Sequence, residues 1–201
     1  MSLPIIYRSS TDNLVFNTDY FDYAAGAGYK KYYLAGTFTS GSTKGYFLTA
    51  DSTLVSASGN TIITATADYD FDITFNNAAI VAAADATISY MCNISGAGSS
   101  IVVIWTLYHV TSGGTETSLG TVTDVSVAPP SSEKKTVKMA LTSKTVGIGE
   151  KLRLTAGITA GGGTSQFYFD PSGHITLTDT IFTPATVNSS AYINIPFKID
   201  L

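Results

Sequence analysis

Three aspartates at alternate positions form the densest set of possible metal ligands in the sequence. The segment DYDFD places Asp68, Asp70 and Asp72 on one face of an extended strand and its aromatic residues on the other. Carboxylates held this close repel one another unless a cation or a basic partner joins them, so Ca²⁺ is one interpretation. The EF-hand pattern fails, because Ile73 and Ala79 occupy the positions that need Gly and Glu. A solvated polar face is therefore the default expectation, with calcium as the alternative and no cofactor expected.

Nucleophilic catalysis has little support in the sequence. The only histidines, His109 and His174, lie near no motif, and no G-x-S-x-G turn is present. A catalytic histidine needs a nucleophile in hydrogen-bonding reach, which no spacing here suggests. Cys92, the single cysteine, lies in an apolar segment and is expected to be a small core residue. We therefore expect no catalytic residues and a protein that is not an enzyme.

The charge content also excludes classes of partner. Charged residues make up 13% of the 201 residues, about half the usual share. The net charge is −4, and residues 45–132 contain no Lys or Arg. Nucleic-acid affinity depends on phosphate contacts, so we expect no nucleic-acid partner. We interpret the three short basic clusters, Lys30–Lys31, Lys134–Lys138 and Lys151–Arg153, as solvated faces.

No segment is apolar over a length that would cross a bilayer, and residues 1–8 lack the pattern of a signal peptide. We therefore expect no membrane partner and folding in the compartment of synthesis. A surface poor in charge and rich in Thr, Ser and Tyr packs readily against other surfaces. This composition favours a subunit of an assembly over a lone monomer.

Alternating apolar and polar residues predict about eight to ten strands separated by Gly, Pro and Ser turns, the spacing typical of a sandwich or jelly roll. One stretch, residues 76–86, suits a short helix and a strand equally. Residues 165–170 and 174–179 are expected to pair across a Pro-Gly turn. Pro196 suggests that the last strand is at an edge or bulged. The predicted strands or hairpin arms are 32–39, 44–50, 61–67, 86–94, 101–110, 117–127, 136–142, 151–158, 165–170, 174–179 and a last strand that places Ile193, Ile195, Phe197, Ile199 and Leu201 on one face.

The segment Ile101–Val110 is apolar on both faces, which a strand in a two-layer sandwich does not need. Val103, Trp105 and Leu107 alternate on one side. The second apolar side must be covered by the chain itself or by a neighbouring subunit. The candidate interface residues on that side are Val102, Ile104, Tyr108 and Val110.

Two stretches carry a resemblance to a known group. Asn17–Thr37 has an aromatic pair after a Gly-x-Gly-Tyr turn, and Thr145–Gly173 has a G-x-x-L-x-L strand, a Gly-rich loop and a Tyr-x-Asp-Pro-x-Gly turn. Both resemble segments of small structural proteins of tailed phages. The second is also loosely similar to the tumour-necrosis-factor-like jelly roll, whose members are trimers. The resemblance implies a virion component and transfers no functional residues.

These observations predict an all-β, antiparallel, jelly-roll-like β-sandwich, with residues 1–30 as an N-terminal arm or first strand and residues 31–201 as a single domain. We expect a virion structural protein, a capsid decoration (cement) or accessory surface protein assembled in the host cytoplasm. Its expected partners are copies of itself, as a symmetric homo-oligomer and foremost a trimer, and virion proteins such as the major capsid protein. The alternative is a receptor- or carbohydrate-binding head of a tail or fibre, with host glycan as the partner.

Overall fold

The computed structural model describes residues 27–38, 44–52, 62–63, 66–95, 100–127, 131–161, 164–169, 174–177, 185–188 and 190–198. These residues form strands and turns and include no helix, which confirms the all-β prediction. Accordingly, no helix among them could cross a membrane. The expected N-terminal arm lies almost wholly outside the described residues, and the first strand crosses the expected boundary at residue 30.

The strands are numbered in chain order. Their bounds are β1 Ala27–Phe38, β2 Lys44–Thr49, β3 Ile62–Ile63, β4 Ala67–Thr74, β5 Ala79–Val81, β6 Asp85–Ser95, β7 Ser100–Val110, β8 Glu116–Val127, β9 Ser131–Ala140, β10 Lys144–Val146, β11 Lys151–Gly161, β12 Thr164–Tyr168, β13 His174–Leu177, β14 Ala185–Asn188 and β15 Tyr192–Lys198.

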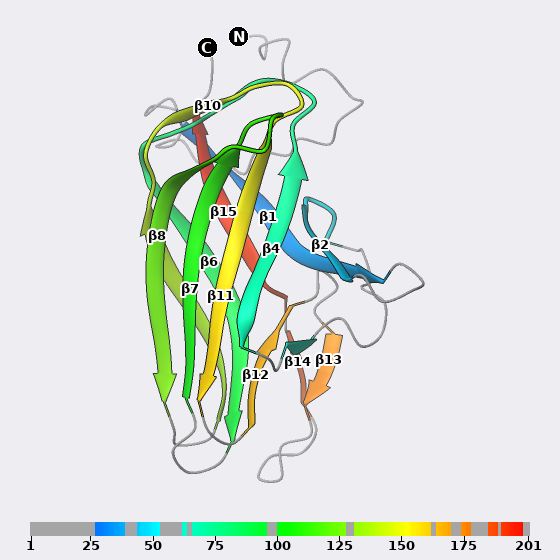
Figure 1. Ribbon diagram of the computed structural model, residues 1–201. Helices are drawn as coiled ribbons and strands as arrows, with labels where there is room; N and C mark the ends of the chain where they lie inside the picture. Colours follow the sequence, from blue (N-terminus) through cyan, green and yellow to red (C-terminus); the bar gives the residue numbers. More distant parts are fainter. Residues whose placement is uncertain are drawn as a thin grey trace, which may run out of the picture.

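One large mixed sheet bends round on itself to form a near-barrel (Figure 1). Strands β4, β11, β7 and β8 form one half, called here the front sheet, and β9, β6, β15 and β1 form the other, called the back sheet. Strand β2 joins the halves, because it pairs antiparallel with β1 and contacts β4 through one parallel bridge, Phe47 to Asp72. The short strands β13 and β14 form a separate pair.

Side-chain alternation explains why the two halves face each other. In β11, Leu152, Leu154, Ala156 and Ile158 are buried, and the residues between them are only partly buried. Apolar side chains of the back sheet join those of the front sheet in one core. Burial of these side chains is the main source of stability, at roughly 25 cal/mol for each Å² of apolar surface.

An aromatic cluster fills the centre of the core. The rings of Tyr90, Trp105 and Phe167 lie 5.3 to 5.6 Å apart between centroids, and Phe71 and Phe169 extend the cluster toward β2. Trp105 is fully buried, and its indole N–H has no hydrogen-bond partner within the described part of the chain. The rings come from strands of both halves, so the cluster connects the front sheet to the back sheet.

A β-bulge brings β8 close to the chain that follows β9. Leu107 pairs with Gly120 and Tyr108 with Ser118, so Leu119 is the extra residue, and its side chain is buried. A Cβ atom on Gly120 would lie 2.4 Å from the carbonyl oxygen of Ala140. Only glycine permits this close approach, which closes the near-barrel at this seam.

Several strand predictions are confirmed. The hairpin on either side of residues 39–43 forms, with β1 and β2 paired from Phe38 opposite Lys44, although the loop itself lies outside the described residues. The stretch that suited helix and strand equally is extended: it contains β5 and the start of β6. Strand pairing decides this, because Val81 pairs with Lys144 of β10 and with Phe197 of β15, and Ala86 pairs with Met139 of β9.

Two strand predictions are wrong. Strand β12 pairs with β6 and β3, whereas β13 pairs with β14, so the expected pair across residues 170–173 is not found in the described residues. The last strand is central, between β1 and β6, so of the two alternatives that Pro196 suggested, an edge or a bulge, the edge is wrong. Proline is tolerated because β15 changes partner here from β6 to β5, and the Pro196 carbonyl accepts a hydrogen bond from Ala82 N.

Candidate ligand-binding face

The outer surface of the back sheet carries a row of polar side chains across four strands. Lys31 of β1 pairs with Asn194 of β15, Asn194 with Thr87 of β6, and Thr87 with Lys138 of β9. At about 4.8 Å between strands, the two lysine Cα atoms are about 14 Å apart. The Asn194 amide donates a hydrogen bond to the Thr87 hydroxyl at 2.9 Å, which fixes the centre of the row.

Tyrosines flank this row. Tyr29 and Tyr33 lie two residues on either side of Lys31 in β1, and Tyr192 pairs with Tyr33 across the two strands. The rings of Tyr33 and Tyr192 meet edge to face, with centroids 5.9 Å apart. All three tyrosines are half-buried. Their rings therefore keep part of their surface in water while the sheet holds them in place.

Two lysines approach the ring of Tyr192. The ammonium group of Lys31 lies 4.4 Å from the ring centroid, and that of Lys134 lies 5.9 Å from it. Lys31 is also 5.8 Å from the centroid of Tyr33. Cation–π attraction of this kind is worth about 0.5–1 kcal/mol at an exposed site. The tyrosines thus restrain two flexible ammonium groups above the same part of the sheet.

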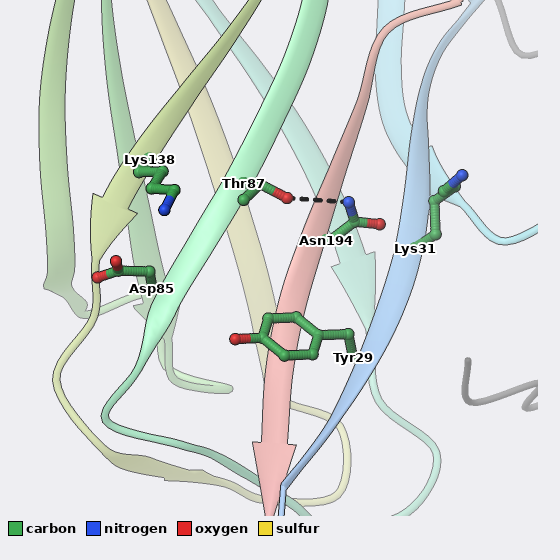
Figure 2. A pocket seen from close by; sticks show the side chains of 6 residues that line it. All are labelled: Tyr29, Lys31, Asp85, Thr87, Lys138 and Asn194. Carbon is green, nitrogen blue, oxygen red and sulfur yellow. Dashed lines mark hydrogen bonds between the residues drawn. The ribbon is translucent and has the colours of Figure 1, made fainter. Parts of the chain in front are cut away.

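These strands create an open hollow of about 470 Å³. Figure 2 shows the side chains that line it. Its floor is formed by the hydrogen-bonded Thr87 and Asn194, and the ring of Tyr29 reaches across toward β15. We name this surface the lysine–tyrosine face. It comprises the residues that line the hollow and three neighbours: Tyr29, Lys31, Asp85, Thr87, Lys138 and Asn194, with Tyr33, Lys134 and Tyr192.

Sequence reasoning missed this face. Lys31 belongs to one basic cluster and Lys138 to another, and we interpreted both clusters as solvated. The pairing of β1, β15, β6 and β9 brings them onto one surface. Lys134 and Lys138 are exposed, while Lys135 between them turns toward β8 and donates to Asp124 at 2.9 Å. The sequence predicts which residues of β9 are exposed, but it does not predict which strand pairs with β9.

The predicted aspartate row lies on the opposite side of the molecule, on the front sheet. Asp70 and Asp72 contact Arg153, and Asp68 stands further along the same face of β4. Arg153 donates to Asp72 through two nitrogens, at 2.7 and 2.9 Å, and to Glu116 at 2.6 Å. The basic partner that the spacing of the aspartates predicted is therefore an arginine. Across the described residues, no group of three or more His, Cys, Asp or Glu side chains is arranged to hold a metal ion.

Arg153 also governs the ionisation of Asp72. Burial alone would raise the pKa of this carboxyl group, but the hydrogen bond and charge of Arg153, with a smaller effect of Lys151, outweigh it. The pKa of Asp72 therefore lies below its ordinary value, and the same pair raises the pKa of Arg153. Both groups are charged at neutral pH, so they connect β4 to β11 by an ion pair.

The four candidate interface residues on β7 differ in how exposed their side chains are. Ile104 is 43% exposed, Val102 and Tyr108 are half-buried, and Val110 is buried within this chain. Val125 of β8 pairs with Val102 and is 53% exposed. Val102, Ile104 and Val125 thus form an apolar strip on the front sheet, and Val110 is not part of it.

The surroundings of His109 and Cys92 indicate structural roles. His109 Nε2 lies 2.7 Å from Glu150 Oε2, which also accepts a hydrogen bond from Gly147 N at 2.6 Å. The Gly147 N–H and then His109 hold the pKa of Glu150 below its ordinary value. Gly149, with φ of 77°, completes this turn. Cys92 is fully buried, as predicted, and the side chain of His174 lies outside the described part.

Comparisons with known proteins give structural neighbours only. No protein-family model and no curated protein matches the sequence. A solved CocE/NonD family hydrolase from Staphylococcus aureus matches with a TM-score of 0.54 and 11% identity, over 86% of this chain and 37% of that one. A second structure of such a hydrolase from the same organism gives 0.49 and 9%, over 85% and 37%. An alpha-amino acid ester hydrolase gives 0.43 and 10%, over 84% and 35%.

These neighbours overturn one expectation. We expected the chain not to be an enzyme, whereas the solved structure that it resembles with a TM-score of 0.54 is that of a hydrolase. The expectation depended on missing contiguous motifs and on an assumed structural role, whereas this fold occurs within enzymes. The chain spans little more than a third of the length of the hydrolases it matches, and at 9–11% identity the likeness shows the fold alone.

Proposed function

We propose that the chain is a carbohydrate-binding β module and that the lysine–tyrosine face is its binding site. The observation that carries this proposal is the hollow on the back sheet, where tyrosine rings border a row of amide, hydroxyl and ammonium groups. Sugars present apolar C–H faces that pack on aromatic rings and hydroxyl groups that pair with such polar side chains. Strands that are hydrogen-bonded to their neighbours in a sheet keep these groups in fixed positions, and this lowers the entropic cost of binding.

The rest of the module would serve to hold this face rigid. A jelly-roll-like sandwich, in which one sheet packs on another, is the architecture we propose for the near-barrel, and such folds include lectin domains. Tyr90 of β6 contacts the rings of Trp105 and Phe167, so aromatic side chains pack against the core side of the back sheet. The binding groups would therefore move little when a ligand arrives.

A glycan array followed by titration calorimetry tests the proposal. We expect Tyr29→Ala to weaken binding of the best glycan about tenfold, a loss of about 1.4 kcal/mol. Tyr108→Ala is the matched control, because Tyr108 is also a half-buried tyrosine but lies on the front sheet. Absence of binding to every glycan, or equal effects of the two substitutions, would refute carbohydrate binding at this face.

A second candidate function rests on the apolar strip of the front sheet. We infer that Val102, Ile104 and Val125 form a contact between copies of the chain in a virus particle, with a homotrimer as the unit. Exposed neighbouring apolar residues of this kind favour a subunit contact. Light scattering should find a trimer that Ile104→Lys dissociates, while Thr136→Lys, at an exposed position on β9 of the back sheet, leaves it intact. A monomer at high concentration without affinity for capsids would refute the assembly role.

A further inference from the structure

The two faces of the molecule carry opposite charge. The front sheet presents Asp68, Asp70, Asp72 and Glu116, and only Lys151 and Arg153 offset them. The lysine–tyrosine face presents Lys31, Lys134 and Lys138 against Asp85. The chain as a whole has a net charge of −4, so the charge of this positive face is opposite in sign to the net charge of the chain. Such local separation of charge attracts a ligand of the opposite sign.

Two of the three lysines of this face, Lys31 and Lys134, are positioned by an aromatic ring and not by a carboxylate. Lys31 and Lys134 approach the ring of Tyr192, and no ion pair joins either of them to a carboxylate among the described residues. A ring neutralises no charge, so both ammonium groups, at 4.4 and 5.9 Å from the same ring centroid, keep their positive charge. An anion at either group would accept hydrogen bonds from it and offset its charge.

From this geometry we propose that the ligand is an anionic carbohydrate whose carboxylate or sulfate group binds at Lys31, with the neighbouring lysines adding positive charge to the same face. This inference rests on the proposed function of the same face. The neutral part of the sugar would contact Tyr29 and the Thr87–Asn194 pair, and the anionic group would contact the ammonium group of Lys31 at one end of the row. Lysine acts as a point charge, so it accommodates a tetrahedral sulfate as well as a planar carboxylate.

Nucleic acid is disfavoured as the anion. Its affinity comes from many phosphate contacts along a strand, whereas this face offers three exposed lysines and places Asp85 in the hollow. A row of about 14 Å between the outer lysines spans a few sugar residues at most. A short anionic segment of a polysaccharide therefore fits the face better than a polyphosphate chain.

Matched polysaccharide pairs provide the test with the full chain. We expect polygalacturonate to bind at least tenfold more tightly than its full methyl ester, or dextran sulfate at least tenfold more tightly than dextran; which pair responds identifies the anionic group. The tighter binding should weaken as salt rises from 50 to 500 mM. Lys31→Gln should reduce the affinity for the anionic member at least fivefold and leave the neutral member unchanged, and Lys31→Arg should restore most of the loss.

Lys151→Gln is the matched control, because Lys151 is 43% exposed on the acidic front sheet. Thermal melting of each variant verifies that the fold is retained. Equal binding of neutral and anionic sugars would overturn the inference and leave the proposed function standing. Binding to no sugar would overturn both. Competition by single-stranded DNA at the same affinity would also overturn the inference, since the face would then be a general polyanion site.

Discussion

Replacement of Arg153 by Met tests how the front sheet is held together. Arg153 lies on β11 and connects Asp72 on one neighbouring strand with Glu116 at the start of β8, across β7. Arg153→Met retains the apolar stem of the side chain and removes the charge, so three carboxylates lose their common partner. We expect a lower free energy of unfolding with an unchanged fold.

The magnitude follows from the exposure of the partners. A hydrogen bond to a charged group is worth about 1.5–3 kcal/mol, and an exposed ion pair about 0–1 kcal/mol. Asp72 is 24% exposed and makes two bonds to Arg153, whereas Asp70 and Glu116 are 44% and 41% exposed. The pair with Asp72 therefore dominates, and we expect a loss of about 2–3 kcal/mol. For a chain of this size that lowers the melting temperature by about 5–10 °C.

Calorimetry and urea unfolding measure the loss. Lys151→Met is the control, because Lys151 Nζ lies 3.5 Å from Asp72 with a side chain that is 43% exposed, and we expect it to cost under about 1 kcal/mol. The reasoning is refuted if Arg153→Met melts within 1 °C of the wild type, or if the lysine substitution costs as much.

Three further outcomes are expected. Gly120→Ala should destabilise the fold by about 1–3 kcal/mol in urea unfolding, because its Cβ would collide with backbone. Gly113→Ala should change stability little, because its Cβ would lie 3.9 Å from Thr111 Oγ1. Equal effects of the two substitutions would contradict the close approach at Gly120. Because the pKa of Asp72 is lowered in the folded state, its carboxylate stabilises the fold at pH values above the ordinary pKa of 3.8. This stabilisation is lost as the pH falls through the pKa of the folded state. Asp72→Asn should therefore make the acid-induced fall in melting temperature shallower, and Asp68→Asn should not. Cys92 should resist thiol reagents until the chain unfolds, and fast labelling of native protein would show that its burial is wrong.

The strands and their inward faces could be predicted from the sequence, because the apolar period of two is local. Leu152, Leu154 and Ile158 are buried as their alternation predicted, and Cys92 is a core residue. The spacing of the three aspartates predicted a shared face and the need for a cation or basic partner. Local pattern also explains the errors, since proline at position 196 gives no sign that β15 changes partner beside it.

Strand pairing decided the rest. Lys31 and Lys138 are more than a hundred residues apart in the chain, and only the order β9, β6, β15, β1 places them in one row with Asn194. Arg153, not a metal ion, became the partner of Asp72 because β11 pairs with β4 in that register. Sequence determines which side chains each strand presents to each face, since that depends on backbone geometry alone. Which faces become neighbours depends on hydrogen bonding and burial between distant segments, and these arise only when the chain has folded.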